Sequence, residues 1–249
     1  AQASTLNFKD LSSKDKINNW VKEKTNGKIE EIVEEIKPQD IAFLINAIYF
    51  NANWSTPFEE EYTQQKDFTL LNNSKVKAQL MTRTASFQYQ ENDQFQAVEL
   101  PYGEEGRYVM RVYLPNESQK FEDFVNSITG KDLEEWGNGF SSMRGTLQLP
   151  KFKTEYSSSL KDMLISMGIK KAFDSGSADF SKMITTKGEN VYISEVMHKT
   201  YIDVNEKGTE AAAVTNIGMS MTSAPSLEET FEMIVDRPFV FTIDDKDSR

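Results

Sequence analysis

The stretch EKGTEAAAVT, residues 206–215, decides how the whole chain is interpreted. It follows directly on residues 191–204, where apolar and polar side chains alternate as they do along a strand. At a period of two, the face that would point inward carries only small, uncharged residues, which are Thr209, Ala211, Ala213 and Thr215. The stretch has no proline, which would remove a hydrogen-bond donor from a strand. It could therefore enter between existing strands without displacing much core volume or burying an unpaired charge.

Composition alone leaves two other structures open for these residues, an Ala-rich helical turn and a flexible loop. The segment MSMTSAPS at residues 219–226 is typical of an exposed, extended tip that proteases can reach. We therefore expect residues 206–229 to differ in structure from the rest of the chain.

The balance of charge excludes some classes of partner. The 249 residues carry 28 Lys and Arg against 39 Asp and Glu, a formal net charge of −11. This acidity argues against a general nucleic-acid binder, which needs basic residues to neutralise phosphates, and against adhesion to an anionic membrane. No apolar run reaches the roughly 18 residues that a membrane helix requires. We expect a partner that is neither nucleic acid nor membrane.

The residue types that most catalytic and metal sites need are scarce. The chain has no cysteine and one histidine, His198, which excludes disulfides, thiolate zinc sites and multi-histidine metal centres. A serine hydrolase would have to pair His198 with Ser220 or Ser223. The nearest motif, GMSMT at residues 218–222, lacks the second glycine of a nucleophile elbow. We predict a protein that is not an enzyme and has no catalytic residue, metal or cofactor, and we keep the hydrolase as an alternative.

Periodicity predicts an α+β chain. Helices are expected over residues 12–25, with Ser12 or Ser13 as the cap, and over residues 29–36, 121–128, 131–136 and 160–167. Strands are expected over residues 41–50, 75–81, 95–100, 108–114, 146–153, 191–204 and 239–243. The sequence has no internal repeat and no Pro- or Gly-rich linker, so we interpret it as one domain with several antiparallel strands.

One predicted strand, IAFLINAIYF at residues 41–50, is almost continuously apolar, which indicates a strand that is buried on both faces. Asn46 in its middle would then be a buried polar residue that needs a hydrogen-bond partner. His198 lies in another predicted strand, where a core histidine with a satisfied hydrogen bond is the more common role than a general base.

Five segments in this order resemble the serpin family of protease inhibitors. EKGTEAAA at residues 206–213 resembles the hinge of the family's reactive loop, and DRPFVFTI at residues 236–243 resembles the motif that follows this loop. The other three are INAIYFNANW (residues 45–54), LPKF (residues 149–152) and VMHK (residues 196–199). The resemblance implies a multi-sheet α+β fold with a large central β-sheet, flanking helices and an exposed reactive loop at about residues 206–230, in a single domain over residues 1–249.

The function that this resemblance implies is that of a suicide-substrate inhibitor of serine or cysteine proteases. The protease would attack the exposed loop, form an acyl-enzyme, and be trapped when the cut loop inserts into the central sheet. The alternative within the family is a non-inhibitory serpin that acts as a carrier or chaperone, although small hinge residues at 209, 211 and 213 speak against it. A plain interaction module with a mobile loop, which binds reversibly, is a third interpretation.

The resemblance also assigns roles to individual residues. Asn46 and His198 resemble the shutter pair beneath the sheet opening, and would be hydrogen-bond partners for each other. Glu206 and Lys151 resemble the salt bridge of the breach, at the top of the sheet, with Trp54 packed nearby. The hinge comprises Gly208, Thr209, Glu210, Ala211, Ala212 and Ala213. Thr209 would be the first side chain to enter the sheet.

The position of the reactive bond follows from counting along the loop. Thr222 stands sixteen residues after Glu206, as the family pattern requires, so Thr222–Ser223 is the predicted bond and Met221–Thr222 the adjacent alternative. Counting back from Pro238 instead gives Leu227–Glu228. A small residue or Met before the cut suits an elastase-, subtilisin- or chymotrypsin-like target. An Arg- or Lys-specific protease is disfavoured, because residues 208–236 contain no Lys or Arg.

Compared with a complete family member, the chain is expected to lack the N-terminal helices that pack behind the sheet and the last C-terminal strand. The remainder of the serpin chain is therefore an expected partner. The family resemblance also implies an extracellular location.

Overall fold

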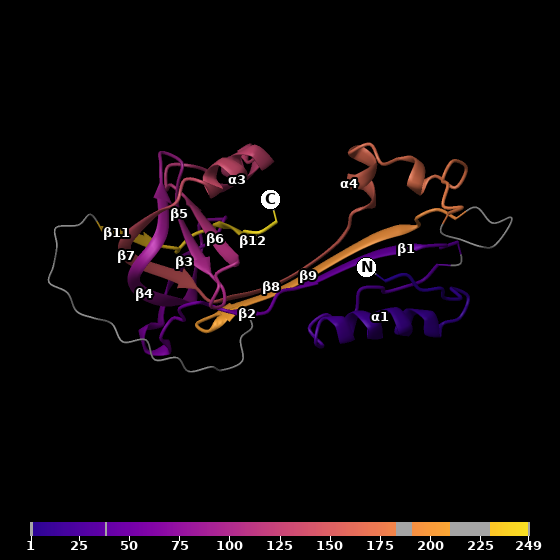
Figure 1. Ribbon diagram of the computed structural model, residues 1–249, viewed down its shortest axis with the longest axis horizontal. Helices are drawn as coiled ribbons and strands as arrows, with labels where there is room; N and C mark the ends of the chain where they lie inside the picture. Colours follow the sequence, from indigo (N-terminus) through magenta and orange to yellow (C-terminus); the bar gives the residue numbers. More distant parts are fainter. Residues whose placement is uncertain (1, 38, 183–190, 210–229, 249) are drawn as a thin grey trace. The chain divides into compact units, whose positions relative to one another are not determined.

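The α+β fold class is confirmed by the computed structural model, which describes residues 2–37, 39–182, 191–209 and 230–248 (Figure 1). Its helices are α1 (Ser12–Lys24), α2 (Phe121–Ser127), α3 (Gly130–Gly137) and α4 (Lys161–Ser166), with short 3-10 turns η1 (Glu60–Tyr62) and η2 (Lys171–Phe173). Its strands are β1 (Phe43–Tyr49), β2 (Ala52–Asn53), β3 (Gln64–Thr69), β4 (Lys75–Glu91), β5 (Phe95–Pro101), β6 (Tyr108–Pro115), β7 (Ser141–Pro150), β8 (Phe152–Ser159), β9 (Glu195–Asn205), β10 (Gly208–Thr209), β11 (Thr230–Ile234) and β12 (Val240–Asp245).

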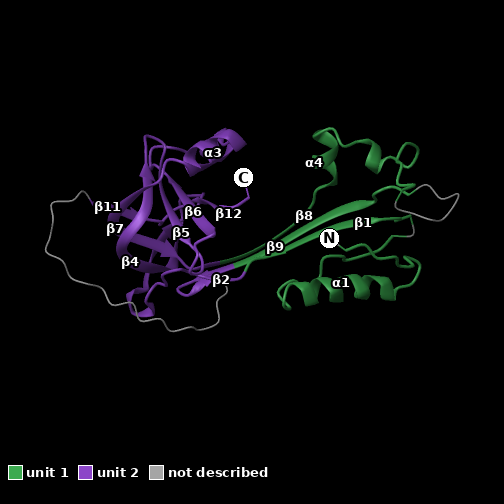
Figure 2. Ribbon diagram, in the orientation of Figure 1, with its two compact units in different colours: residues 1–50, 153–202 green, residues 51–152, 203–249 purple. Residues whose placement is uncertain are grey.

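The chain divides into two compact units, each made of two chain segments (Figure 2). Residues 1–50 and 153–202 form the first unit, and residues 51–152 and 203–249 form the second. The strands form two mixed sheets, one with the order β1-β9-β10-β2 and β8 beside β9, the other with the order β11-β7-β4-β5-β6-β12 and β3 beside β4. The interpretation of residues 1–249 as one domain stays a prediction.

In the first unit, β1 and β9 run parallel and pair directly over seven residues each, from Phe43 with Glu195 to Tyr49 with Tyr201. Helix α1 covers one face of β1: its buried Ile17 and Val21 join a core against which alternate residues of the strand pack, namely Phe43, Ile45, Ala47 and Tyr49. The expectation that this strand is buried on both faces is wrong. The residues between them point to the other face, where Leu44 is 53% and Ile48 46% exposed and Asn46 is exposed as well.

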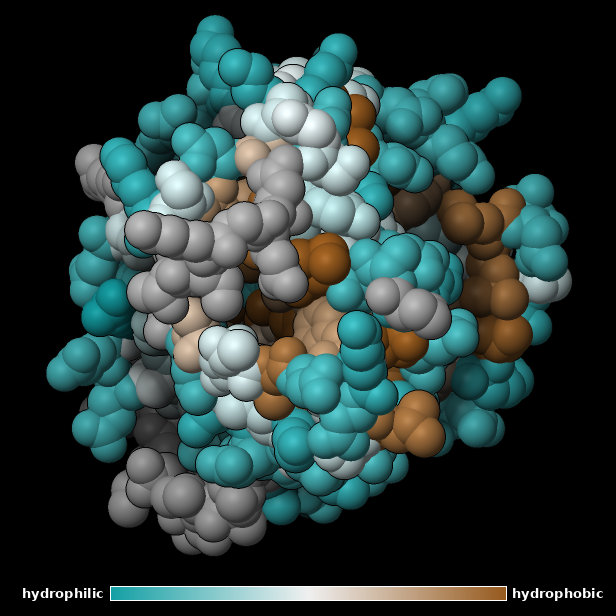
Figure 3. Space-filling view, turned by 90° about the vertical axis from the view of Figure 1, so that its right-hand side faces the viewer, coloured by the Kyte–Doolittle hydropathy of each residue, from teal (hydrophilic) through white to brown (hydrophobic). Residues whose placement is uncertain are grey.

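Large apolar side chains thus reach the surface of this unit, and the space-filling view shows apolar residues among hydrophilic ones on the face that it draws (Figure 3). Besides Leu44 and Ile48, those exposed in the first unit include Ile41, Met163, Met167 and Ile169. The apolar residues of β1 therefore lie on both faces of the strand, and α1 covers only one of these faces.

The helix expected over residues 29–36 does not form, because a side chain satisfies the backbone there instead. The buried Asn18 on α1 accepts hydrogen bonds at Oδ1 from the N–H groups of Ile32 and Val33, both at 3.0 Å, and donates from Nδ2 to the carbonyl of Val33 at 2.9 Å. Ile29, Ile32 and Val33 are still buried. The spacing of these apolar residues therefore reflects their burial against α1 and does not indicate a helix.

The cap of α1 also differs from the prediction. Leu11 occupies the N-cap position and makes no side-chain cap bond. Ser13 is buried and donates from Oγ to the carbonyl of Asn7 at 2.7 Å, while Ser12 bonds to Asp10. The two hydroxyls therefore bond to the segment before the helix, and Asp10 accepts the first helical N–H, that of Ser12, at 2.9 Å.

The second unit is built around β4, a strand of 17 residues that pairs with β3, β5 and β7 in turn. The sequence predicted only its first seven residues. A core of Phe95, Ala97, Tyr113 and Phe124 packs with Trp136 of α3, whose ring is stacked on that of Phe124. Strand β11, which the sequence analysis did not predict, pairs parallel with β7, and β12 pairs antiparallel with β6.

Candidate functional site

The short strand β10 lies between β9 and β2, antiparallel to both. Gly208 is the register partner of Asn205 on one side and Asn53 on the other. Gly208 has φ +153°, and a Cβ on it would lie 2.2 Å from the carbonyl oxygen of Ala52. Only glycine fits this close approach of three strands.

Thr209 follows in the same strand and is fully buried, with 0% of its surface exposed. Its Oγ1 lies 2.6 Å from the hydroxyl of Tyr102 in a hydrogen bond. Burial raises the pKa of Tyr102, so the phenol stays protonated and can act as the donor. The side chain that was predicted to enter the sheet first is already between two strands.

The ring of Tyr102 stacks on the indole of Trp54, with 4.4 Å between ring centres and 17° between planes. Trp54 is 3% exposed and donates from Nε1 to the carbonyl of Asn205 at 2.9 Å. Its backbone N–H donates to the carbonyl of Lys207, also at 2.9 Å. Trp54 therefore fixes both sides of the turn that connects β9 to β10.

Glu206, in that turn, forms an ion pair with Lys151, in which Nζ lies 2.9 Å from Oε2. The side chain of Glu206 is only 7% exposed, against 40% for Lys151. Thr63 donates from Oγ1 to the other carboxylate oxygen at 2.8 Å, and the carbonyl of Glu206 accepts from the N–H of Phe58. Burial alone would raise the pKa of Glu206, but hydrogen bonds from Lys151, its own backbone and Thr63 outweigh burial and hold the pKa below its usual value.

The depressed pKa predicts that this ion pair stabilises the protein at neutral pH and not in acid. Glu206→Gln is expected to lower the free energy of unfolding by about 1–2 kcal/mol at pH 7. The difference should persist down to the ordinary carboxyl value of 4.5 and vanish as the pH falls through the lower folded-state pKa. Thermal unfolding of both proteins between pH 7 and pH 3 measures it. Glu60→Gln is the matched control, because Glu60 is 72% exposed and 3.7 Å from Lys207; a difference that did not depend on pH would contradict the prediction.

Asn46 and His198 are register partners across β1 and β9, so the structure brings their backbones together. The expectation that they satisfy each other is wrong. Asn46 is exposed, whereas His198 is half-buried and its Nδ1 is buried without a hydrogen-bond partner among the described residues. The ring of Tyr156 on β8 lies against His198, with 6.4 Å between ring centres. Their role as a shutter stays a prediction.

The rest of the predicted site falls outside the described residues. This applies to hinge residues Glu210, Ala211, Ala212 and Ala213, to the reactive-bond residues Met221, Thr222, Ser223, Leu227 and Glu228, and to Ser220 of the alternative hydrolase. Within the described ranges, no three His, Asp or Glu side chains gather in a way that could hold a metal ion. None of the helices in the part of the chain that the structure describes is long and apolar enough to cross a membrane.

Sequence reasoning missed two residues of this site, Tyr102 and Thr63. Both bond to predicted residues, Thr209 and Glu206, from positions 107 and 143 residues away in sequence. Neither lies in a motif that the sequence analysis singled out. Pairing over such distances cannot be read from a local pattern.

Comparison with known proteins agrees with this geometry. A family profile described as serpin (serine protease inhibitor) matches residues 1–249. An uncharacterized serpin-like protein of Thermococcus kodakarensis is 38% identical over 232 residues, which are 93% of this chain and 53% of that protein. Serpin B13 of Homo sapiens is 33% identical over 244 residues, 96% of this chain and 61% of that protein.

Solved structures show the same fold. The native-state crystal structure of Tengpin, a thermophilic serpin, superposes with a TM-score of 0.84 at 35% identity, covering 96% of this chain and 60% of that one. Human thyroxine-binding globulin complexed with its ligand superposes with a TM-score of 0.84 at 26% identity, covering 98% of this chain and 63% of that one.

The described residues thus form two mixed sheets, a glycine-led strand held between β9 and β2, and an ion pair between the buried Glu206 and the exposed Lys151. The chain belongs to the serpin family. It spans 53% and 61% of the two curated relatives described above.

Proposed function

We propose that the protein inhibits serine proteases as a suicide substrate, with residues 206–230 as the reactive loop and Thr222–Ser223 as the bond that the protease attacks. Met221–Thr222 is the alternative bond. The protein itself contributes no catalytic residue; its target supplies the nucleophile.

The observation that carries this proposal is the direct pairing of β1 with β9 over seven residues. No strand lies between them there, whereas Thr209 already lies between β9 and β2. A chain that continued from Thr209 along β9 would have to separate β1 from β9. This is the arrangement expected of a sheet that can accept one more strand.

The reaction begins when the serine oxygen of the protease attacks the carbonyl carbon of Thr222. The peptide bond breaks, an ester joins Thr222 to the protease, and Ser223 becomes a new amino terminus. The freed loop would then pair with both β1 and β9, which exchanges one hydrogen-bonded ladder for two. Displacement and distortion of the attached protease would disturb its oxyanion hole, and the ester would not be hydrolysed. The uncut protein is therefore held by a kinetic barrier.

We further propose an extracellular elastase-, subtilisin- or chymotrypsin-like target. The residues before the two candidate bonds, Thr222 and Met221, are small or apolar and suit these proteases. The similarity to thyroxine-binding globulin keeps a carrier role as the second candidate. A carrier would bind its ligand without forming a covalent complex with a protease.

Incubation of the full-length protein with pancreatic elastase, subtilisin and trypsin in parallel tests the proposal. Elastase or subtilisin should give a complex that survives boiling in detergent, while trypsin should not. Mass spectrometry of the released C-terminal peptide should show Ser223, or Thr222 for the alternative bond, at its start. Cleavage without a covalent complex would reject the inhibitor, and a peptide that began at a residue other than Thr222 or Ser223 would reject the assigned bond.

A further inference from the structure

Arg83 on β4 is a partly buried cation that no carboxylate neutralises in the described part of the chain. Its guanidinium carbon lies 4.8 Å from the ring centre of Phe58 and 4.7 Å from that of Phe87. Nη1 donates to the carbonyl oxygen of Thr56, while Nε is buried and has no partner among the described residues. Burial lowers the pKa of Arg83 to about 10, which leaves the side chain charged at neutral pH.

Arg111 on β6 shows how a partly buried arginine is ordinarily compensated. Its Nε donates to Glu99 at 3.1 Å and its Nη1 to Asp244 at 3.2 Å. Arg83 has aromatic faces in place of carboxylates. Such contacts contribute about 0.5–2 kcal/mol, which does not replace a paired anion for a buried charge.

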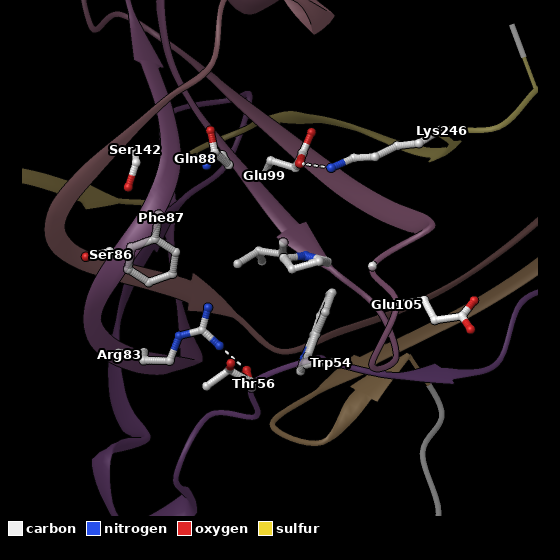
Figure 4. Close-up of a pocket in the computed structure, with 13 residues that line it drawn as sticks. Trp54, Thr56, Arg83, Ser86, Phe87, Gln88, Glu99, Glu105, Ser142 and Lys246 are labelled. Carbon is white, nitrogen blue, oxygen red and sulfur yellow. Dashed lines mark hydrogen bonds and ion pairs between the residues drawn. The ribbon is translucent and has the colours of Figure 1, made fainter. Parts of the chain in front are cut away.

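A cavity of about 340 Å³ opens beside Arg83, and all of its lining residues belong to the second unit (Figure 4). Its apolar walls are formed by Trp54, Phe87, Leu100 and Pro101. Its polar neutral groups are Thr56, Ser86, Gln88 and Ser142. Pockets that hold small organic ligands have this size, and the lining of this one combines apolar walls with polar groups in similar measure.

The other charged residues of the lining do not neutralise Arg83. Glu99 lies on the opposite side of the residues drawn in Figure 4 and accepts hydrogen bonds from Lys246 and Arg111. Glu105 points away from the cavity in the same view. The cavity therefore has an uncompensated positive charge at one end and apolar walls beside it.

We propose that this cavity binds a small carboxylate with an aromatic body. The carboxylate would accept a charge-assisted hydrogen bond from Nη2 of Arg83, because Nη1 already donates to Thr56 and Nε is buried. The aromatic body would lie against Trp54 and Leu100. A single negative charge matches the single guanidinium, whereas the second charge of a phosphate dianion would find no other unpaired cation in the lining, because Lys246 pairs with Glu99.

Titration of the full-length protein with 3-phenylpropionate tests this site. Trp54 lines the cavity and the other tryptophans, Trp20 and Trp136, do not, so binding should change the intrinsic fluorescence; calorimetry gives the stoichiometry. We expect saturable binding of one molecule per chain. The uncharged 3-phenylpropionamide, which has the same shape, should bind at least about tenfold more weakly. Equal affinities, or no saturable binding of the acid, would overturn the proposal.

Variants locate the site. Arg83→Met should abolish binding of 3-phenylpropionate, and Ser142→Trp should do so by filling the cavity while it leaves Arg83 in place. Arg144→Met is the matched control, because Arg144 is exposed on β7 and does not line the cavity. Binding that survived both Arg83→Met and Ser142→Trp would place the ligand elsewhere. If Arg83→Met does not fold, Ser142→Trp and the comparison of acid with amide still decide. No protease is used, so the outcome is independent of the proposed inhibition.

Discussion

Thr209→Arg is expected to convert the protein from an inhibitor into a substrate of the protease that it would otherwise trap. Thr209 is fully buried and hydrogen-bonded to Tyr102, so an arginine there is expected to keep β10 out of the sheet in the uncut protein. Loop insertion would then have to bury an unpaired guanidinium. Burying such a charge costs several kcal/mol. Each ~1.4 kcal/mol added to a barrier slows a step about tenfold, so the protease should complete hydrolysis before the loop inserts.

The measurement is the number of protein molecules consumed per protease molecule inhibited, together with the fraction of detergent-resistant complex. Thr154→Arg is the matched control, because Thr154 is exposed on β8 and forms no side-chain contact described above. Thr209→Ser keeps the hydroxyl for Tyr102 and should stay close to wild type. Unchanged stoichiometry for Thr209→Arg would count heavily against strand insertion.

Cleavage within the loop is expected to make the protein much more resistant to heat. Insertion would replace the single ladder between β1 and β9 by two, adding about as many residue pairs as the seven that now connect them. At about 0.5–1.5 kcal/mol for each hydrogen bond, and about 2–4 °C per kcal/mol for a chain of this size, Tm should rise by on the order of 20 °C.

Thermal unfolding before and after limited cleavage of the loop by thermolysin measures this change, because a metalloprotease forms no acyl-enzyme and is not trapped. The control is protein treated with inactivated thermolysin, which separates the effect of the cut from that of handling. A cleaved protein that unfolds at the temperature of the intact one would show that no strand was added, and would remove the physical basis of the proposed inhibition.

Sequence patterns correctly predicted those helices and strands in which the repeat of apolar residues matches the face that the element buries. Helix α1 and the centres of β5, β6 and β9 lie where alternation or a three-to-four residue spacing placed them. The helix predicted over residues 29–36 does not form, because the side chain of Asn18, more than ten residues away, accepts hydrogen bonds from the backbone there. A local pattern records that residues are buried and not which group completes their hydrogen bonds.

For the site, the family resemblance predicted which distant residues lie together, and spacing along the sequence could not predict this. The Glu206–Lys151 pair and the neighbouring Trp54 lie close in space although they come from three distant segments. The prediction that Asn46 is buried was wrong, because it assumed that a continuously apolar strand is covered on both faces. Tyr102 and Arg83 escaped notice since their importance depends on what surrounds them, and a single sequence does not show this.

The close fit of Gly208 against Ala52 has a consequence for the timing of the proposed inhibition. Because this residue is already aligned with Asn205 and Asn53, the alignment of an incoming strand is chosen before any protease arrives. With Thr209 directed inward, Ala211 and Ala213 would follow on the same side by alternation. Cleavage would then determine only the time at which the strand forms, because its register is already set in the intact molecule.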